Sequence, residues 1–276
     1  MHSVHANGAS IPALGLGTWT LKGDECSGIV AEALRGGYRH VDTAAIYANE
    51  EAVGAGLRAS GVARDAVFVT TKVWWTDLGA ADLRRAAEAS LSRLGLDAVD
   101  LLLIHWPNPA IALSDTIGAL NRVRQEGLAR HIGVSNFPTA LLREAIALSD
   151  APLAVNQVEH HPYLDQGRVR AVCEAAGMAI VGYCPLHRGG GLLEEPVILR
   201  AAEAHGRTPA QVVLRWHVQQ PGTVAIPRTT RKERLAENAA IFDFALSDAE
   251  MAQISALGAA ASRICDYDFS PRWDPA

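Results

Sequence analysis

The sequence predicts an α/β protein, a (β/α)8 TIM barrel, from three observations. The chain has 276 residues, which is the usual size of one such barrel. Short β-branched apolar runs alternate with Ala/Leu-rich amphipathic stretches, a pattern typical of βα units on a parallel sheet. Eight such units favour a closed barrel over an open doubly wound sheet. Because no low-complexity linker divides the chain, we expect a single barrel domain over residues 1–276.

The first expected element is a β-hairpin over residues 4–14. Its turn contains Asn7-Gly8, a pair suited to the positive φ angles of a tight turn. Eight apolar runs follow and are the expected barrel strands. They lie near residues 14–17, 40–42, 67–73, 99–105, 131–135, 153–157, 179–183 and 224–226.

Helices are expected between these strands. Residues 80–94 have apolar side chains at helical spacing and end at Gly95, a natural left-handed C-cap. Thr208 and Pro209 form a suitable N-cap and first-turn pair for a later helix. Two further helical stretches, 195–205 and 247–257, exceed the eightfold count. We expect them as two additional helices outside the repeating barrel units.

Composition excludes several classes of protein. The formal net charge is −5 and the pI is about 6.1, so no global field attracts nucleic acid or an anionic membrane. Residues 1–10 lack the apolar core of a secretory signal, and no apolar run approaches the ~20 residues of a membrane helix. Four scattered cysteines without zinc-site spacing indicate free thiols. A cytoplasmic monomer without nucleic-acid or membrane partners is therefore expected.

Polar residues stand where several of the expected strands end. In such barrels the loops after the strands build the active site. His105 directly follows the apolar run 101–104, a costly position for a polar group unless it has partners. The polar residues at strand ends are Asp42, Lys72, His105, Ser135, Asn136, Gln157 and Tyr183, and Tyr47 lies in the loop after Asp42.

Four of these residues could together reduce a carbonyl group. A free phenol has a pKa of ~10, and a nearby ammonium lowers that value. Tyr47 would then be the general acid, with Lys72 lowering its pKa and Asp42 holding Lys72 in place. His105 would hydrogen-bond the carbonyl oxygen and orient the substrate. Because no side chain supplies hydride, this chemistry requires a nicotinamide cofactor.

A candidate phosphate site follows the last expected strand. Residues 225–234 combine four cations with two threonines and an expected helix start, where barrels commonly bind phosphate. The arginine fork matches phosphate oxygens, so the extra phosphate of NADPH would account for the arginines. By contrast, Gly15-Leu16-Gly17 is weak evidence for a dinucleotide fingerprint, because Thr20 replaces the third glycine.

Six short segments carry motifs that stand in the same order in one known superfamily. Several independent motifs in the right order are more specific than any one of them alone. They are residues 15–19 (GLGTW), 37–44 (GYRHVDTA), 71–74 (TKVW), 102–107 (LLIHWP), 133–137 (GVSNF) and 226–228 (IPR). On these segments the sequence resembles the aldo-keto reductase superfamily over essentially its whole length. The tail 270–274 is similar to that of short bacterial members related to diketogluconate reductases.

The resemblance implies NADPH-dependent reduction of small aldehydes or ketones, such as diketogluconate- or methylglyoxal-like carbonyls, to alcohols. It implies a catalytic tetrad of Asp42, Tyr47, Lys72 and His105. It also implies cofactor contacts from Gly17, Thr18, Asp42, Ser135, Asn136, Gln157, Tyr183, Pro185, Leu186, Ile226, Pro227, Arg228, Thr229, Arg234, Glu237 and Asn238. In this set Ser135, Asn136 and Gln157 hydrogen-bond the nicotinamide amide, and Tyr183 stacks on its ring. Arg228, Thr229 and Arg234 grip the adenosine phosphate, and Glu237 and Asn238 face adenine. The implied substrate pocket consists of Trp19, Tyr47, Trp74, His105 and Trp106.

The sequence departs from the family pattern at three places. Arg228 and Thr229 replace the usual lysine and serine, which keeps the chemistry but leaves the preference for NADPH over NADH open. Cys184 replaces a serine beside Tyr183 and could be oxidisable. The loop 187–193 is short and glycine-rich, so a clamp over the cofactor would be partial or mobile.

Simpler interpretations exist for each feature. Asp42 and Lys72 could form only a structural ion pair, residues 228–234 a solvated helix start, and Tyr183 a packing residue. His160-His161 could suggest a metal, but no spaced ligand set accompanies the pair, so none is expected. At the level of function, the alternatives are a non-catalytic NADPH-binding or sensing barrel and a barrel of unrelated chemistry such as a metal hydrolase.

Overall fold

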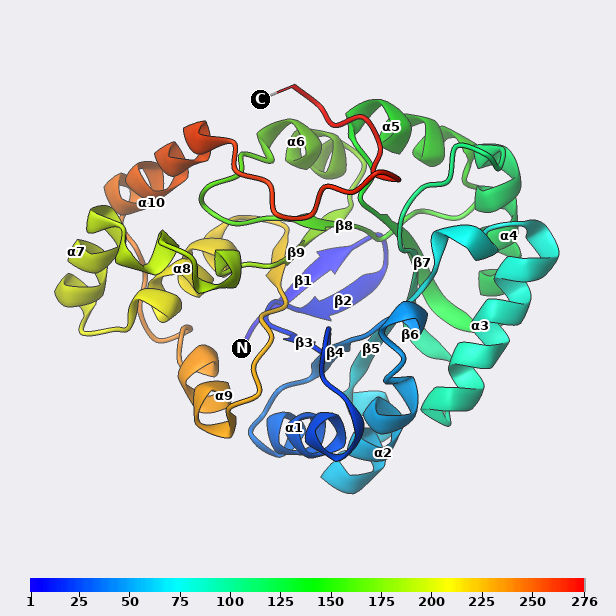
Figure 1. Cartoon of the computed structure of the whole chain (residues 1–276), viewed down its shortest axis with the longest axis horizontal. Helices are drawn as coiled ribbons and strands as arrows, with labels where there is room; N and C mark the ends of the chain where they lie inside the picture. The colour runs from blue at the N-terminus through cyan, green and yellow to red at the C-terminus, as the bar shows by residue number, and fades with distance from the viewer. Residues whose placement is uncertain (276) are drawn as a thin grey trace.

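A computed structural model, which describes residues 1–275, shows eight parallel strands surrounded by helices (Figure 1). Each strand pairs with the next one along the chain. The strands are β3 (Leu16–Gly17), β4 (His40–Asp42), β5 (Phe68–Val73), β6 (Val99–Ile104), β7 (Ala129–Ser135), β8 (Val155–Glu159), β9 (Ala179–Tyr183) and β10 (Thr223–Ala225). The predicted (β/α)8 fold and its eight strands are confirmed.

The first and last strands of the sheet meet and close it into a ring. Leu14 forms a parallel bridge with Ala225, and the Gly15 amide donates to the Ala225 carbonyl at 2.9 Å. Beyond β10, the Gly17 amide donates to the Pro227 carbonyl at 3.0 Å. A closed sheet leaves no exposed edge, and it gathers the carboxyl ends of all eight strands at one mouth.

Ten helices lie in the described part of the chain. They are α1 (Gly23–Arg35), α2 (Glu50–Ser60), α3 (Ala80–Leu94), α4 (Leu113–Gln125), α5 (Thr139–Leu148), α6 (Gly167–Ala175), α7 (Pro196–His205), α8 (Pro209–Gln219), α9 (Lys232–Ala239) and α10 (Asp248–Ser255). Thr208 and Gln211 form a capping box at the start of α8, and Gly95 ends α3 with φ +68°. The two predicted additional helices are confirmed as α7 and α10.

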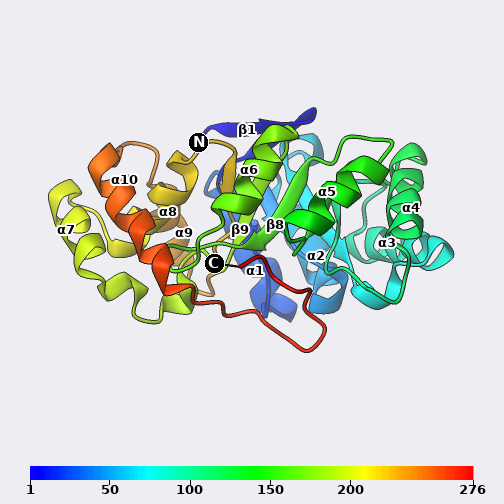
Figure 2. The same ribbon diagram turned by 90° about the horizontal axis from the view of Figure 1, so that it is seen from above.

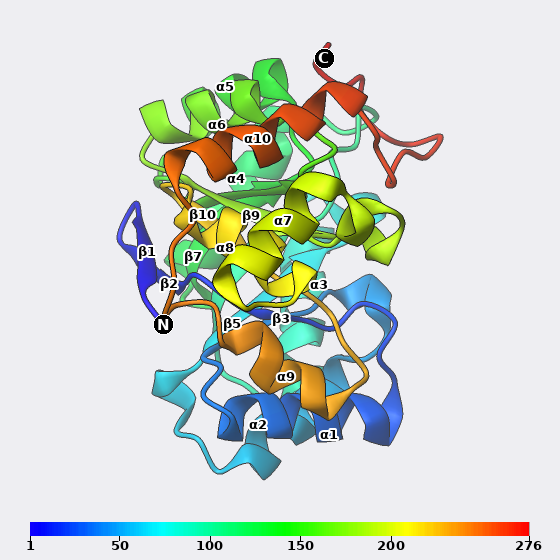
Figure 3. The same ribbon diagram turned by 90° about the vertical axis from the view of Figure 1, so that its left-hand side faces the viewer.

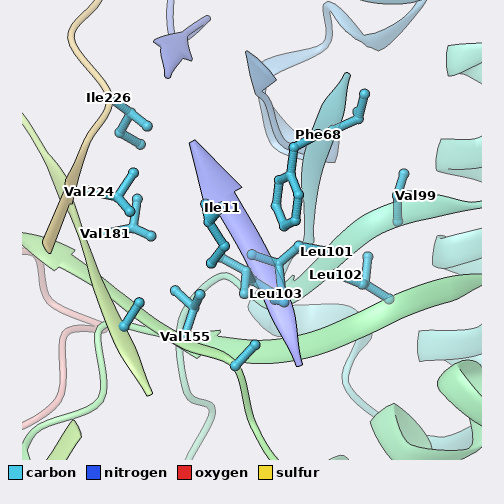
Figure 4. Close-up of a cluster of buried hydrophobic side chains, with 14 of the residues drawn as sticks. Ile11, Phe68, Val99, Leu101, Leu102, Leu103, Val155, Val181, Val224 and Ile226 are labelled. Carbon is cyan, nitrogen blue, oxygen red and sulfur yellow. The ribbon is translucent and has the colours of Figure 1, made fainter. Parts of the chain in front are cut away.

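The N-terminal hairpin and the C-terminal tail lie at opposite ends of the barrel (Figures 2 and 3). The hairpin consists of β1 (Ser3–Ala6) and β2 (Ala9–Pro12), as the sequence predicts. Ile11 of β2 is fully buried and points among side chains of the barrel strands, including Leu101, Leu103 and Val155 (Figure 4). Burying such a side chain contributes ~1.5–3 kcal/mol, so the hairpin seals the end of the barrel opposite the mouth.

A second apolar cluster holds the additional helices against the barrel. Ile198 of α7, Trp216 of α8 and Ile254 of α10 are buried together there. The indole of Trp216 also donates to the Ser255 hydroxyl at 3.0 Å. Trp216 is thus a core residue. Among residues 1–275 there is no helix with the length and apolar character needed to cross a membrane.

Candidate active site

A buried ion pair lies at the mouth, where β4 and β5 end. Lys72 Nζ is 2.6 Å from Asp42 Oδ1 and donates to the Thr43 carbonyl at 2.8 Å. The second carboxylate oxygen of Asp42 accepts a hydrogen bond of 2.7 Å from Gln157 Nε2. The side chains of Lys72 and Asp42 are almost completely buried. A buried charge is tolerated only when it is paired in this way, so the pair has a single well-defined geometry.

Tyr47 faces this pair from the loop after β4. It ends a short 3₁₀ turn, Ala45–Tyr47, and its hydroxyl lies 3.4 Å from Lys72 Nζ. The amine also lies 5.0 Å from the centre of the Tyr47 ring. The loop after β4 therefore delivers the phenol to the lysine, as the sequence analysis expected of a converging cluster.

Asn49 fixes the loop that carries Tyr47, and sequence reasoning missed it. This buried amide donates to the carbonyls of Thr18 at 2.8 Å and Leu21 at 3.0 Å, and it accepts from the Thr43 hydroxyl at 2.8 Å. It thereby ties the loops after β3 and β4 together. In the sequence, Asn49 stands just before the acidic first turn of a helix. An asparagine at that position indicates only an ordinary helix start.

His105 completes the cluster at the end of β6. Its ring centre lies 5.5 Å from that of Tyr47 and 5.2 Å from that of Trp74, both in edge-on arrangements. Its carbonyl accepts from Asn136 Nδ2 at 2.9 Å, whereas its buried Nδ1 has no hydrogen-bond partner within residues 1–275. The structure thus brings Asp42, Tyr47, Lys72 and His105 together.

Burial sets the protonation states of these groups. It lowers the pKa of His105 well below 6.5, so the imidazole is neutral, and it lowers the pKa of Lys72 against the pull of Asp42. For Tyr47, burial and then the negative charge of Asp42 raise the pKa well above 10. The phenol of Tyr47 therefore stays protonated. The lowering of its pKa by Lys72, which the sequence analysis expects, stays a prediction.

The polar residues predicted to face a nicotinamide lie together at the ends of β7, β8 and β9. The Tyr183 hydroxyl donates to Asn136 Oδ1 at 2.7 Å, and Asn136 Nδ2 donates to Ser135 Oγ at 3.1 Å. Gln157, which follows at the next strand, already contacts Asp42. Asn136 has φ +64°, a left-handed conformation that asparagine tolerates better than most residues. The Asn136 amide donates to the Gln157 carbonyl at 2.8 Å, so hydrogen bonds connect these residues to the ion pair.

Other residues of the predicted cofactor set lie around the same mouth. The buried Thr18, next to Gly17, donates through its hydroxyl to the Asp42 carbonyl at 2.9 Å. Pro185 is buried and accepts from His217 Nε2 at 3.2 Å, and Leu186 is half-buried beside it. A hydrogen bond with Cys265, and then burial, raise the pKa of Cys184, which keeps its thiol protonated and less reactive.

The candidate phosphate segment leads from β10 into α9, as predicted. Ile226 and Pro227 are buried, whereas Arg228 and Arg234 are exposed. The side chains of the two arginines have no hydrogen bond or ion pair within residues 1–275. Thr229 Oγ1 accepts from the Arg231 amide at 3.0 Å, which shapes the turn before the helix.

The residues predicted to face adenine lie further along α9. Asn238 is buried, and Glu237 accepts from the Thr208 hydroxyl at 2.8 Å. Glu237 thus connects α9 with the start of α8.

Aromatic side chains surround the cluster. Trp19 is about half exposed and its ring centre lies 4.8 Å from that of Tyr47, while Trp106 is buried. Tyr267 and Phe269 join this wall from the C-terminal tail, and sequence reasoning did not identify either of them. Phe269 lies 5.6 Å from Trp74 and 5.5 Å from Trp106, measured between ring centres.

The pair His160-His161 belongs to a different environment. His161 Nε2 lies 2.8 Å from Glu159 Oε1, and the ring of His160 packs against Trp216 and His217. Within residues 1–275, no group of three or more His, Cys, Asp or Glu side chains is arranged to hold a metal ion.

The fold and the cluster at its mouth together define a class, that of (β/α)8-barrel oxidoreductases. The chain belongs to the aldo/keto reductase family, whose family model matches residues 13–259. Members of this family are oxidoreductases that reduce carbonyl compounds with nicotinamide cofactors. The expected relationship to the short bacterial members is also confirmed.

Individual relatives match over most of their length. The chain is 46% identical to the morphine 6-dehydrogenase of Pseudomonas putida, covering 91% of this chain and 89% of that protein. It is 44% identical to the glyoxal reductase of Bacillus subtilis, covering 91% and 90%. A crystal structure provisionally identified as 2,5-diketo-D-gluconic acid reductase B matches with a TM-score of 0.96 at 45% identity, covering 100% and 98%. A Bombyx mori aldo-keto reductase in complex with NADP matches with a TM-score of 0.89 at 34% identity, covering 96% and 94%.

Proposed function

We propose that this protein is an NADPH-dependent reductase of small aldehydes and ketones in which Tyr47 donates the proton. One observation carries the proposal: Lys72 Nζ contacts the Tyr47 hydroxyl at 3.4 Å while Asp42 holds the amine at 2.6 Å. A protonated phenol at the mouth is a proton donor for a carbonyl oxygen. The ammonium beside it stabilises the phenolate that remains after the transfer.

The other members of the cluster have complementary roles. The neutral imidazole of His105 orients the carbonyl by a hydrogen bond to its oxygen. Asp42 keeps Lys72 charged and in place. Because these groups are fixed by strand ends, little reorganisation is needed when the substrate binds.

The residues present fit NADPH. When bound, it supplies the hydride that no side chain can provide. Ser135, Asn136 and Gln157 would hold the nicotinamide amide, and Tyr183 would stack on its ring. Arg228 and Arg234 are exposed cations before and in the first turn of α9, and their side chains have no partner in the described part of the chain. They suit a phosphate that NADH lacks, which supports NADPH as the cofactor. The glyoxal reductase among the relatives supports small carbonyl compounds as substrates.

A carbonyl panel followed by loss of NADPH absorbance tests the proposal. We expect turnover with methylglyoxal and with nitrobenzaldehyde, and weaker activity when NADH replaces NADPH. Tight NADPH binding without turnover of any carbonyl would contradict it and would favour a cofactor-sensing protein. No binding of NADPH at all would contradict both functions.

A further inference from the structure

Two of the four cysteines lie in contact at the mouth of the barrel, on segments that are far apart in the sequence. Cys184 directly follows β9 and is half-buried. Cys265 is buried in the C-terminal tail, which crosses the mouth (Figures 1 and 2). Both are free thiols, and the Cys184 thiol donates a hydrogen bond to the Cys265 sulfur. The fold therefore holds two reduced sulfur atoms next to each other.

The backbone of Cys265 is fixed from below by a buried carboxylate. Glu159 ends β8 and is fully buried. Its Oε2 accepts the Cys265 amide at 2.7 Å, and its Oε1 accepts the Ile264 amide at 2.7 Å. A shift of this part of the tail would leave a buried charge without its donors, which is costly. The position of Cys265 is consequently well defined.

The loop that carries Cys184 is held in an unusual backbone conformation. Cys184, His187 and Arg188 have φ angles of +50°, +49° and +53°, a left-handed region that residues other than glycine seldom adopt. Nε2 of His187 lies 3.3 Å from the Ser262 hydroxyl of the tail. Such a conformation persists only where the surrounding contacts maintain it. The loop after β9 and the tail are thus already held side by side by noncovalent contacts.

Polar neighbours make Cys265 the more acidic of the two thiols. Arg188 Nη2 donates to Cys265 Sγ at 3.7 Å, and the Tyr267 hydroxyl also donates to this sulfur. The hydrogen bond from Cys184 has the largest effect, and together these contacts lower the pKa of Cys265 against its burial and the charge of Glu159. Because the thiolate is the nucleophilic form of cysteine, Cys265 is the sulfur that reacts first.

The other two cysteines lie in a different environment. Cys26 in α1 and Cys173 in α6 are buried in the apolar core. Burial raises the pKa of Cys26 to about 11 and that of Cys173 to about 12. Buried thiols of this kind are inert, so the reactivity is confined to the pair at the mouth.

We propose that Cys184 and Cys265 form a reversible disulfide, with hydrogen peroxide as the oxidant, that joins the loop after β9 covalently to the tail. The Cys265 thiolate attacks one oxygen of the peroxide, and the O–O bond breaks. The sulfur becomes a sulfenic acid, and the hydroxide that leaves takes up the proton released by the thiol, which gives water.

The second step closes the link. The Cys184 sulfur attacks the Cys265 sulfur and the S–O bond breaks, so that the hydroxyl leaves with the proton of Cys184 as a second water. In total two thiols lose two electrons and two protons, and one peroxide is reduced to two waters. This modification site goes beyond the proposed reductase function and requires neither a carbonyl substrate nor a cofactor.

Intact mass before and after peroxide treatment tests the proposal. The wild type should lose about 2 Da, the mass of the two hydrogens removed. Digestion without reductant should give a peptide that links Cys184 to Cys265, and dithiothreitol should reverse the change. The thiols that react with Ellman's reagent after denaturation should fall from four to two. A gain of oxygen without a link, a link to Cys26 or Cys173, or no reaction would overturn the proposal.

Serine variants separate the two sulfur atoms. In Cys184→Ser the sulfenic acid on Cys265 has no partner thiol, so dimedone should label residue 265. In Cys265→Ser, dimedone should label Cys184 more slowly than that, since burial still raises the pKa of this thiol. Faster labelling of Cys184 would contradict the assigned order of the two steps. Cys26→Ser and Cys173→Ser are the matched controls and should form the link like the wild type.

Thermal unfolding shows whether the link fits the native mouth. A disulfide that closes such a long loop restricts the unfolded chain, so the Tm of the oxidised wild type should rise by roughly 5–10 °C. Dithiothreitol should remove the rise, and Cys184→Ser should show none. An unchanged or lower Tm would mean that the two thiols are not preorganised for the bond, against the proposal. None of these measurements uses NADPH or turnover, so their outcome is independent of the proposed function.

Discussion

The cluster at the mouth and the segment that leads into α9 handle charge in opposite ways. Lys72 and Asp42 are buried, and both carboxylate oxygens of Asp42 are used by partners inside the barrel. Arg228 and Arg234 are exposed, and their side chains find no partner within residues 1–275. Buried charges must be paired before any ligand arrives, whereas exposed cations cost nothing while they remain hydrated.

This difference suggests that the two regions determine different steps of the reaction. The cluster has its geometry before substrate binds, so its residues should mainly determine the rate of the chemical step. The exposed arginines gain a partner only when a phosphate binds, so they should mainly determine cofactor affinity. Substitutions in the two regions should consequently change different kinetic constants.

Tyr47→Phe should have the largest effect. Removing one general acid typically lowers turnover by ~10²–10⁴-fold, and the cofactor should still bind because no predicted cofactor contact is lost. Steady-state kinetics with nitrobenzaldehyde and a fluorescence titration with NADPH measure the two quantities. Full activity of Tyr47→Phe would remove the proton-donor role. A matching loss of NADPH affinity would instead break the proposed division between the two regions.

Arg228→Ala and Arg234→Ala should have an intermediate effect of the other kind. Each substitution removes hydrogen bonds to a charged phosphate, which are worth ~1.5–3 kcal/mol, or about 10–150-fold in the Kd for NADPH. The Kd for NADH and the kcat at saturating NADPH should change little. Arg231→Ala is the matched control. Arg231 is also exposed, but its guanidinium is already paired with the Glu233 carboxylate, 4.0 Å away. Equal losses for both cofactors would show that these arginines do not contact the extra phosphate.

The sequence predicted the parts of this molecule that repeat or that stand at strand ends. The eight strands and the additional helices followed from periodicity, and the hairpin from its Asn7-Gly8 turn. His105 stood out because it directly follows an apolar run. Contacts between distant segments left no such trace. The hydrogen bond from the Thr139 amide to the Asp274 carboxylate spans 135 residues, and Asn49 looked like an ordinary helix start. The direction of the Tyr47 pKa shift also required the structure, because the burial of the phenol and its nearness to Asp42 depend on the fold.

The smallest effect should be the loss of folding stability as the pH falls. This loss should come from buried histidines and should not depend on the exposed segment that leads into α9. Burial lowers the pKa of His40 in β4 to about 4 and that of His217 in α8 to about 3, against ~6.5 in the unfolded chain. Between pH 7 and pH 6 the unfolded chain binds protons that these native histidines do not. Stability therefore falls by about 0.7 kcal/mol per buried histidine, and the loss continues until the native groups titrate.

Urea unfolding at pH 7 and pH 6 measures this loss. His40→Gln should be less stable at both values, since Nε2 of His40 is 3.2 Å from the Thr70 hydroxyl. The decrease in the free energy of unfolding from pH 7 to pH 6 should nevertheless be smaller in this variant by about 0.7 kcal/mol, the contribution of one histidine, because glutamine does not titrate. Arg231→Ala, in the exposed segment, should keep the wild-type decrease. An unchanged decrease in His40→Gln would mean that His40 takes up protons as readily in the barrel as in the unfolded chain. The contrast between buried, preorganised groups and exposed, solvated ones would then not extend beyond the ion pair at the mouth.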